Sequence, residues 1–247
     1  MLLKTAVSTS CILPMKPEPC CFQFDFMNCF NLDQNARGNI MGDAELRIKE
    51  LAICSRNNVR RSQDIITHWL RFDLTLSGSE TPEWFSFQSQ GSSLNADMLL
   101  PSWFISTFLD FAFCVVVEYE IPAINREEYY DFNLRVSCKC CFKTTNGYKE
   151  YLITHFRSHH GPVFESDSVY LWYKHRDLSI WLIRNCYRVN EASFEFKAEK
   201  LSSKKEVNVK MKGCGVHLVM ESDSMSDYEE EEQNDSTSES EEDEQVL

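Results

Sequence analysis

Two cysteines and two histidines of this 247-residue chain are spaced as zinc ligands often are. Cys138 and Cys141 form a Cys–x2–Cys pair, and thirteen residues separate them from the pair His155–x3–His159. Thiolate and imidazole ligands at such spacing hold tetrahedral Zn²⁺ in small nucleic-acid-binding domains. One hypothesis is therefore a zinc-dependent nucleic-acid-binding protein that uses Cys138, Cys141, His155 and His159.

The residues around the cysteine pair favour a strand over a metal-binding turn. Apolar side chains alternate here with mostly polar ones, and the apolar set is Leu134, Val136, Cys138, Cys140 and Phe142. Neighbouring side chains of a strand point to opposite faces, so Cys138 and Cys141 would lie on different faces of a sheet. A single ion needs both thiolates on one side. The strand therefore predicts buried structural thiols, with no metal and no other cofactor.

Motifs of other chemistries are missing from the sequence. No G-x-S-x-G nucleophile elbow, phosphate-binding glycine loop or H-E-x-x-H motif occurs. The chain has eight glycines, which is few for loops that bind phosphate through backbone amides. Six histidines could supply a general base, yet none belongs to a recognisable catalytic motif. We therefore expect a protein that is not an enzyme.

The charge of the chain is concentrated at its C-terminal end. The formal net charge is −13, from 38 acidic and 25 basic residues. Thirteen of the acids and none of the bases lie in residues 221–247, so residues 1–220 carry 25 of each. A neutral body argues against a nucleic-acid partner, because phosphate binding needs a basic surface. The tail is rich in Ser, Asp and Glu and is expected to be disordered.

The eleven cysteines do not indicate a secreted protein. The N-terminal residues lack the continuous apolar stretch of a signal peptide, and an odd number of cysteines fits reduced thiols. The most apolar window, residues 102–121, contains Asp110 and Glu118 and is rich in aromatic and β-branched residues. This window is typical of a buried strand, so we expect a soluble intracellular chain with no membrane segment.

The hydrophobic pattern predicts one helix followed by a domain of strands. Apolar residues between Leu46 and Ile53 occur among charges at roughly helical spacing, which favours a short amphipathic helix over about 32–54. A polar, basic linker is expected to follow this helix. From about residue 68 to residue 220, eight or nine short apolar or alternating runs are separated by turn residues. Such runs are typical of an all-β sandwich or barrel.

Motifs in order along the chain are similar to those of one family. The run "LSGSETPEWFSFQSQGSSL" (76–94) resembles L-P-G-x-E-I-P-x-W-F-x-x-Q-x-x-G-S-S-[LI], with Thr81 in place of the last Ile before Pro. It is followed by "LPSWF" (100–104), "DFAFCVVV" (110–117) and "KGCGVHLVM" (212–220). Upstream, "FMNCFNLDQNARGNI" (26–40) resembles the segment that leaves a last leucine-rich repeat. The family is the C-terminal jelly-roll/Ig-like domain (C-JID, post-LRR) of plant TIR–nucleotide-binding–leucine-rich-repeat disease resistance proteins.

The resemblance implies an all-β, jelly-roll/Ig-like β-sandwich with a short N-terminal helical segment and a disordered acidic C-terminal tail. The implied organisation is an unassigned leader (1–22), a repeat-exit segment with a linker (23–62), the jelly-roll/Ig-like domain (63–220) and the tail (221–247). No L-x-x-L-x-L repeats precede Phe26, and TIR and nucleotide-binding motifs are missing. We therefore expect a fragment or truncated product that lacks the NAD-cleaving activity of the TIR domain.

The resemblance also implies a recognition and scaffolding role in plant innate immunity. In the family, this domain packs on the end of the repeat solenoid and helps contact pathogen effectors through loops. The expected partners are a pathogen effector protein and the leucine-rich-repeat domain of a receptor, with no nucleic acid and no membrane. The expected location is the cytoplasm, with the nucleus as a second compartment.

We expect protein contacts on loops and on one exposed sheet face, because strands bury alternate residues and leave the others free to vary. Two long connections between predicted strands combine charge, tyrosine and histidine, a mixture that suits protein interfaces. The candidate contact residues in these connections are Arg126, Tyr129, Tyr130, His159 and His160.

The aromatic pair of the first motif is expected to belong to the core. Pro82 fixes its own φ and ends the preceding structure, while glycines at both ends of the run allow tight turns. Trp84 and Phe85 would then fold back as a plug over one end of the sandwich. The structural positions taken from the motifs are Pro82, Trp84, Phe85, Gly91, Trp103, Cys114, Cys214 and Gly215.

Overall fold

The structure, a computed structural model, describes residues 21–26, 29, 32–61, 70–97, 107–120, 133–147, 149–158, 167–175, 189–202 and 208–221. Several sequence predictions lie outside these ranges. They concern most of the leader, Trp103, the five candidate contact residues of the two long connections, and the acidic tail beyond Glu221.

Within the described ranges the chain forms one helix and ten strands. Their bounds are β1 (Cys21–Phe26), α1 (Gln34–Arg61), β2 (Arg71–Ser77), β3 (Phe87–Gln90), β4 (Ser93–Asp97), β5 (Phe108–Glu120), β6 (Asn133–Thr144), β7 (Lys149–Ser158), β8 (Ser168–Lys174), β9 (Val189–Ser202) and β10 (Asn208–Met220).

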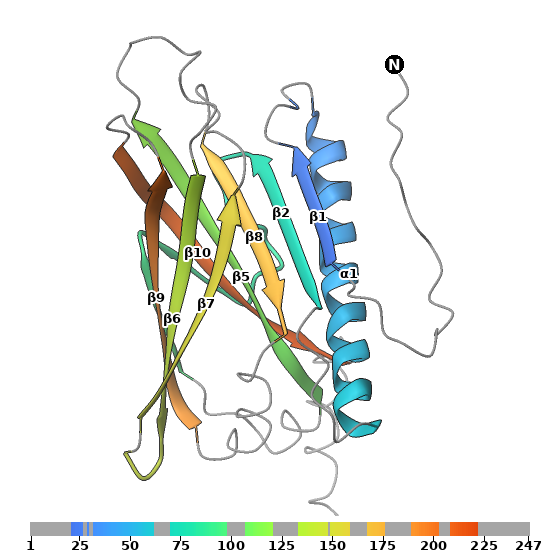
Figure 1. The fold of residues 1–247 in the computed structure, drawn as a ribbon, viewed down its shortest axis with the longest axis vertical. Helices are drawn as coiled ribbons and strands as arrows, with labels where there is room; N and C mark the ends of the chain where they lie inside the picture. The colour runs from blue at the N-terminus through green and yellow to red at the C-terminus, as the bar shows by residue number, and fades with distance from the viewer. Residues whose placement is uncertain are drawn as a thin grey trace, which may run out of the picture.

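The strands form two sheets that pack face to face, which confirms the predicted all-β sandwich. The larger sheet has six strands in the order β1-β2-β8-β5-β10-β3, and the smaller has four in the order β4-β9-β6-β7. Figure 1 shows β9, β6 and β7 at one side of the molecule and β2, β1 and α1 at the other. In the described part of the chain the strand pairs are antiparallel, apart from the parallel pair of β1 with β2.

Aromatic side chains fill the space between the sheets. Phe111 and Phe113 of β5 contact Phe142 and Phe194 of the smaller sheet, with ring centroids 5.7 to 6.4 Å apart. Trp172 of β8 is fully buried and stacks on Phe113 at 5.5 Å. Burying such large rings supplies much of the free energy that orders the strands.

A second core lies between α1 and the outer face of the six-stranded sheet. The helix buries Ala44, Ile48, Leu51 and Ala52 against apolar side chains of β2, β5 and β8. These four positions are spaced as i, i+4, i+7 and i+8, as one face of a helix requires. The helix is therefore a third layer of the fold.

The helix is longer than the sequence pattern predicts. It begins after Asp33, whose Oδ1 accepts a hydrogen bond from Ala36 N at 2.7 Å, as an N-cap does. It continues to Arg61, through residues that were expected to form a solvated linker. That expectation is wrong for the first of these residues, because Ser55 is buried and Arg56 forms an ion pair with Glu221 at 2.6 Å. Polar composition concealed these tertiary contacts.

Arg37 joins the start of the helix to the end of β2. Its Nη1 donates to the carbonyl of Ser77 at 2.6 Å, and its Nε donates to the carbonyl of Leu32 at 3.3 Å. The start of the helix and the start of the Trp84 motif are thus held together by one guanidinium.

Three strands differ from the sequence expectation. Two of the apolar or alternating runs of the sequence, 206–212 and 214–220, are separated by Gly213, yet β10 continues from Asn208 to Met220 with an irregularity between Met211 and Gly213. β1 and β3 were not predicted, because each is short and lies at an edge of the six-stranded sheet.

Among the described residues, no helix is long and apolar enough to cross a membrane.

Candidate interaction face

The Trp84–Phe85 motif forms a structural site on the outer face of the six-stranded sheet. Phe85 is buried in the core that α1 also covers, and its ring lies 4.4 Å from that of Trp84. The indole of Trp84 meets the imidazole of His217 edge-on at 4.9 Å. The core role of Phe85 is as predicted, whereas the position of the pair differs. The two rings cover β10 on the sheet's outer face and do not close an end of the sandwich.

Backbone bonds explain why the motif needs its particular residues. The amide of Gln88 donates to the carbonyls of Pro82 and Phe85, at 3.1 and 3.3 Å, so one side chain holds the turn closed. Gly91 has a φ of 83°, a conformation that favours glycine. A Cβ on Gly215 would lie 2.9 Å from Phe85 and 2.7 Å from Thr81, so only glycine fits beneath the loop.

The two cysteines of the motifs are structural. Cys114 and Cys214 are fully buried and lie on opposite faces of the six-stranded sheet, one in each core. Burial raises the pKa of the Cys214 thiol to about 11 and raises that of Cys114 further. Both thiols are therefore protonated near neutral pH and poorly suited to nucleophilic chemistry.

The structure separates the cysteines of the zinc hypothesis, as the strand interpretation predicts. Cys138 is fully buried between the sheets, while Cys141 is half-buried on the opposite face of β6. His155 pairs with Ser137 on that same outer side, and His159 lies outside the described residues. In the described ranges, no three His, Cys, Asp or Glu side chains gather closely enough to hold a metal ion.

The outer face of the four-stranded sheet is the exposed sheet face on which recognition was expected. We call it the open face. It consists of the side chains that β6, β7 and β9 direct away from the core, and its charged members are Arg135, Lys139, Lys143, Lys149, Arg157, Glu191, Glu195, Lys197 and Glu199.

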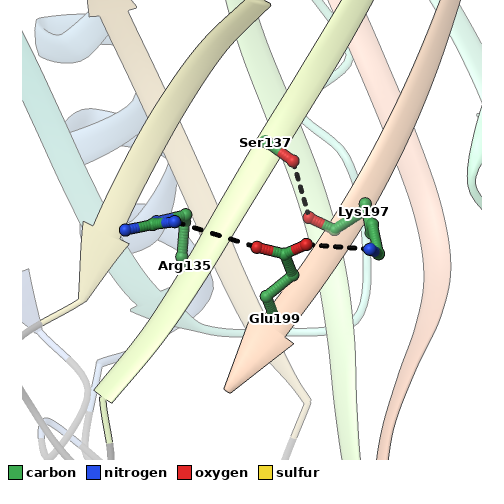
Figure 2. A network of polar contacts seen from close by, with 4 residues as sticks. All are labelled: Arg135, Ser137, Lys197 and Glu199. Carbon is green, nitrogen blue, oxygen red and sulfur yellow. Dashed lines mark hydrogen bonds and ion pairs between the residues drawn. The ribbon is translucent and has the colours of Figure 1, made fainter. Parts of the chain in front are cut away.

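Charged residues of neighbouring strands pair across the open face near the start of β6 and the end of β9. Glu199 of β9 lies between Arg135 of β6 and Lys197 (Figure 2). Its Oε2 is 3.9 Å from Arg135 Nη1, and its Oε1 is 2.8 Å from Lys197 Nζ. The Ser137 hydroxyl donates to the Lys197 carbonyl at 3.4 Å. The hydrogen bond from Lys197 lowers the pKa of Glu199, and the same bond raises the pKa of Lys197. Exposed pairs of this kind contribute little stability, but they fix the charge pattern that a partner meets.

Apolar side chains stand exposed along β7. Tyr151 is 51% exposed and Ile153 is 61% exposed. The ammonium of Lys139 lies over the Tyr151 ring, 4.9 Å from its centroid, and Lys139 pairs with Ile153 across the strands. A cation, a tyrosine and an isoleucine side by side are a combination that suits protein interfaces.

A hollow of about 790 Å³ lies at one end of the open face. Its walls include Asn95, Cys141, Lys149 and the ion pair of Lys143 with Glu191, which measures 2.8 Å. These side chains offer hydrogen bonds and charge to a partner.

Sequence reasoning missed Tyr151 and Ile153 because β7 has apolar residues on both faces. Leu152 and Phe156 alternate with Tyr151 and Ile153, so the strand alone does not reveal its buried side. The neighbouring strand does reveal it. Lys139 lies opposite Ile153, and a lysine in mid-strand must face water.

The fold defines the class of the protein, a β-sandwich domain of two sheets with one N-terminal helix. The sequence of residues 76–225 matches the C-JID domain family, and the chain belongs to that family. C-JID is a non-catalytic region of plant TIR–nucleotide-binding–leucine-rich-repeat disease resistance proteins, so the resemblance found in the motifs is confirmed.

Curated relatives carry the names of disease resistance proteins from Arabidopsis thaliana. Disease resistance protein RPP2B is 32% identical over 145 residues, which cover 57% of this chain and 11% of RPP2B. Disease resistance-like protein DSC1 is 28% identical over 218 residues, covering 79% of this chain and 16% of DSC1. Disease resistance protein RPS4B is 28% identical over 216 residues, which cover 82% of this chain and 17% of RPS4B. The chain therefore spans less than a fifth of the length of these relatives.

A solved structure of a family 22 carbohydrate-binding module of Clostridium thermocellum Xyn10B is 10% identical and covers 60% of this chain and 81% of that module. Its TM-score of 0.27 is too low to support an argument about fold or ligand.

Proposed function

We propose that the chain is a non-enzymatic recognition and scaffolding module of plant intracellular immunity. It would contribute to recognition of a pathogen effector protein together with a leucine-rich-repeat domain. The observation that carries this proposal is the C-JID match over residues 76–225 in a chain whose relatives are disease resistance proteins.

The edge at β1 supports the part of the proposal that concerns the repeats. β1 pairs with β2 in parallel, and none of the described strands pairs with its other edge. Leucine-rich repeats contribute one strand each to a continuous parallel sheet. β1 precedes the rest of the domain in the chain, so a repeat solenoid on its N-terminal side would meet the sandwich at a strand of matching direction.

The open face supports the part that concerns an effector. It combines exposed Tyr151 and Ile153 with basic and acidic residues, as protein interfaces do.

We place the protein in the cytoplasm, with the nucleus as a second compartment, because receptors of this class act inside the cell.

The test is affinity capture of the tagged full chain from plant tissue with and without pathogen, followed by mass spectrometry. We expect a repeat-containing receptor to be enriched over a tag-only control, and a pathogen protein to be enriched after infection. The proposal fails when neither class of protein is enriched in either tissue.

A further inference from the structure

β7 is a long edge strand of the four-stranded sheet. It has ten residues and, among the described strands, pairs only with β6. Its register with β6 is regular from Lys149 to Ser158, with no bulge, and it contains neither proline nor glycine. Proteins usually shorten, bend or interrupt such an edge, because its unpaired backbone groups invite another strand.

The other sheet edges of the described chain are shorter. β4, at the opposite edge of the same sheet, has five residues. β1 and β3, at the edges of the larger sheet, have six and four. Length and regularity therefore single out β7 as the edge best able to accept an added strand.

Charge and apolar exposure indicate the chemistry of that strand. Tyr151 and Ile153 offer apolar contact at alternate positions of β7. The charged residues of the open face on β6 and β7 are all basic, and its acidic residues lie on β9, two strands from the edge; the basic set is Arg135, Lys139, Lys143, Lys149 and Arg157. A strand added to β7 would meet this basic side first.

We propose that the free edge of β7 binds an extended, acidic segment of a partner protein as an additional strand of the sheet. Backbone hydrogen bonds would supply affinity, and alternate side chains would supply specificity. Apolar residues of the segment would pack beside Tyr151 and Ile153, and its acidic residues would lie near Lys139 and Lys149. This proposal rests on the recognition role proposed above and names the geometry of one contact.

The test uses the purified full chain and a fluorescent decapeptide in which every second residue is valine or glutamate in turn and the residues between are threonine, so that valine and glutamate share one face of the added strand. Two control peptides separate the contributions to binding. In one, lysine replaces each glutamate, and the other keeps the valine–glutamate–threonine sequence but has its central backbone amides N-methylated, which blocks strand pairing and retains the side chains. Anisotropy gives the affinity, and hydrogen exchange gives the protection of residues 149–158.

We expect the acidic peptide to bind and to slow exchange in β7, while each control peptide binds at least about tenfold more weakly, a difference of about 1.4 kcal/mol. Lys139→Glu should weaken binding by a similar factor. The matched control is Lys197→Glu, which makes the same change of charge on the same face at a position two strands from the edge. It should have a much smaller effect, because salt screens charge over about 8 Å.

Four outcomes would overturn the proposal. These are no binding of the acidic peptide, equal binding of the N-methylated peptide, equal binding of the lysine peptide, and carbodiimide cross-links between Lys149 of β7 and the chain's own acidic tail. The last would show that the tail occupies the edge. Because the assay needs no plant partner, failure here leaves the capture experiment to decide the proposed function independently.

Discussion

Close contact between β10 and the Trp84 loop explains one glycine of the family motif at the scale of single atoms. The loop passes over Gly215 so closely that a Cβ there would lie 2.9 Å from Cδ1 of Phe85 and 2.7 Å from Cγ2 of Thr81. Neither neighbour can move freely, because Phe85 is buried and the turn is closed by Gln88. The glycine therefore maintains the contact between loop and sheet.

Gly215→Ala should lower the free energy of unfolding by about 1–3 kcal/mol, the usual cost of overpacking. Gly213→Ala is the matched control on the same strand, because the nearest atom to its Cβ would be the Ser89 carbonyl oxygen at 3.5 Å. Denaturant unfolding of both variants checks the prediction. Equal stability of the two variants would show that the loop does not press on β10.

Asp73 makes stability depend on pH. Desolvation by burial raises the pKa of this carboxyl from 3.8 to about 6. The neighbouring Arg71 guanidinium lowers the same pKa, but by less than burial raises it. The folded chain therefore binds the proton more tightly than the unfolded chain, and this contribution to stability is lost as pH rises from about 4 to about 6. Asp73→Asn should remove this dependence. The stability of the variant relative to the parent should rise across that window by up to about 3 kcal/mol, at 1.36 kcal/mol per pKa unit.

Unfolding curves at pH 4, 5, 6 and 7 measure the difference. A constant difference between variant and parent at all four values would mean that the carboxyl of Asp73 titrates as a solvated group.

Zinc binding is tested at the same scale. Because Cys138 and Cys141 lie on opposite faces of β6, Cys141→Ser with His155→Ala should leave the melting temperature nearly unchanged in chelator and in added zinc. Metal analysis of the parent should find no stoichiometric zinc. One zinc per chain that disappears with these two substitutions would contradict the strand geometry.

At the scale of elements, the sequence predicted what depends on local periodicity. β6 was identified because its alternation is strict, and the separation of Cys138 from Cys141 followed from it. The length of α1 and the continuity of β10 were not predictable, because they depend on tertiary contacts such as Arg56 with Glu221. Of the candidate site, the existence of an exposed sheet face was predicted. Tyr151 and Ile153 were not, because β7 is apolar on both sides.

The helix should be an integral part of the domain. Ile48 is 1% exposed in the core beneath α1, so Ile48→Ala should lower the free energy of unfolding by about 2–5 kcal/mol. Leu46→Ala is its matched control, because Leu46 is 63% exposed on the same helix and should change stability by less than about 0.5 kcal/mol. Calorimetry should show one cooperative transition for each variant. Equal stability of the two variants would mean that α1 is not anchored to the sheet.

At the scale of the whole molecule, our proposals assign different partners to two of the four sheet edges of the described chain, β1 and β7. β1 offers a parallel strand on the side where the chain enters the domain, and β7 offers a long antiparallel edge beside the open face. In our proposal the first edge meets a repeat solenoid and the second meets an effector. A change on the open face should therefore affect the two partners unequally.

The most direct test compares three tagged forms of the full chain in infected plant tissue. They are the parent, a variant with Lys139→Glu and Ile153→Asp on the open face, and the Lys197→Glu control. Quantitative mass spectrometry of the captured proteins measures each partner. Our account predicts that all three recover a repeat-containing receptor, and that only the double variant, Lys139→Glu with Ile153→Asp, recovers the pathogen protein about tenfold less well than the parent. Equal recovery of the pathogen protein by all three forms, or recovery of neither partner by the parent, would contradict it.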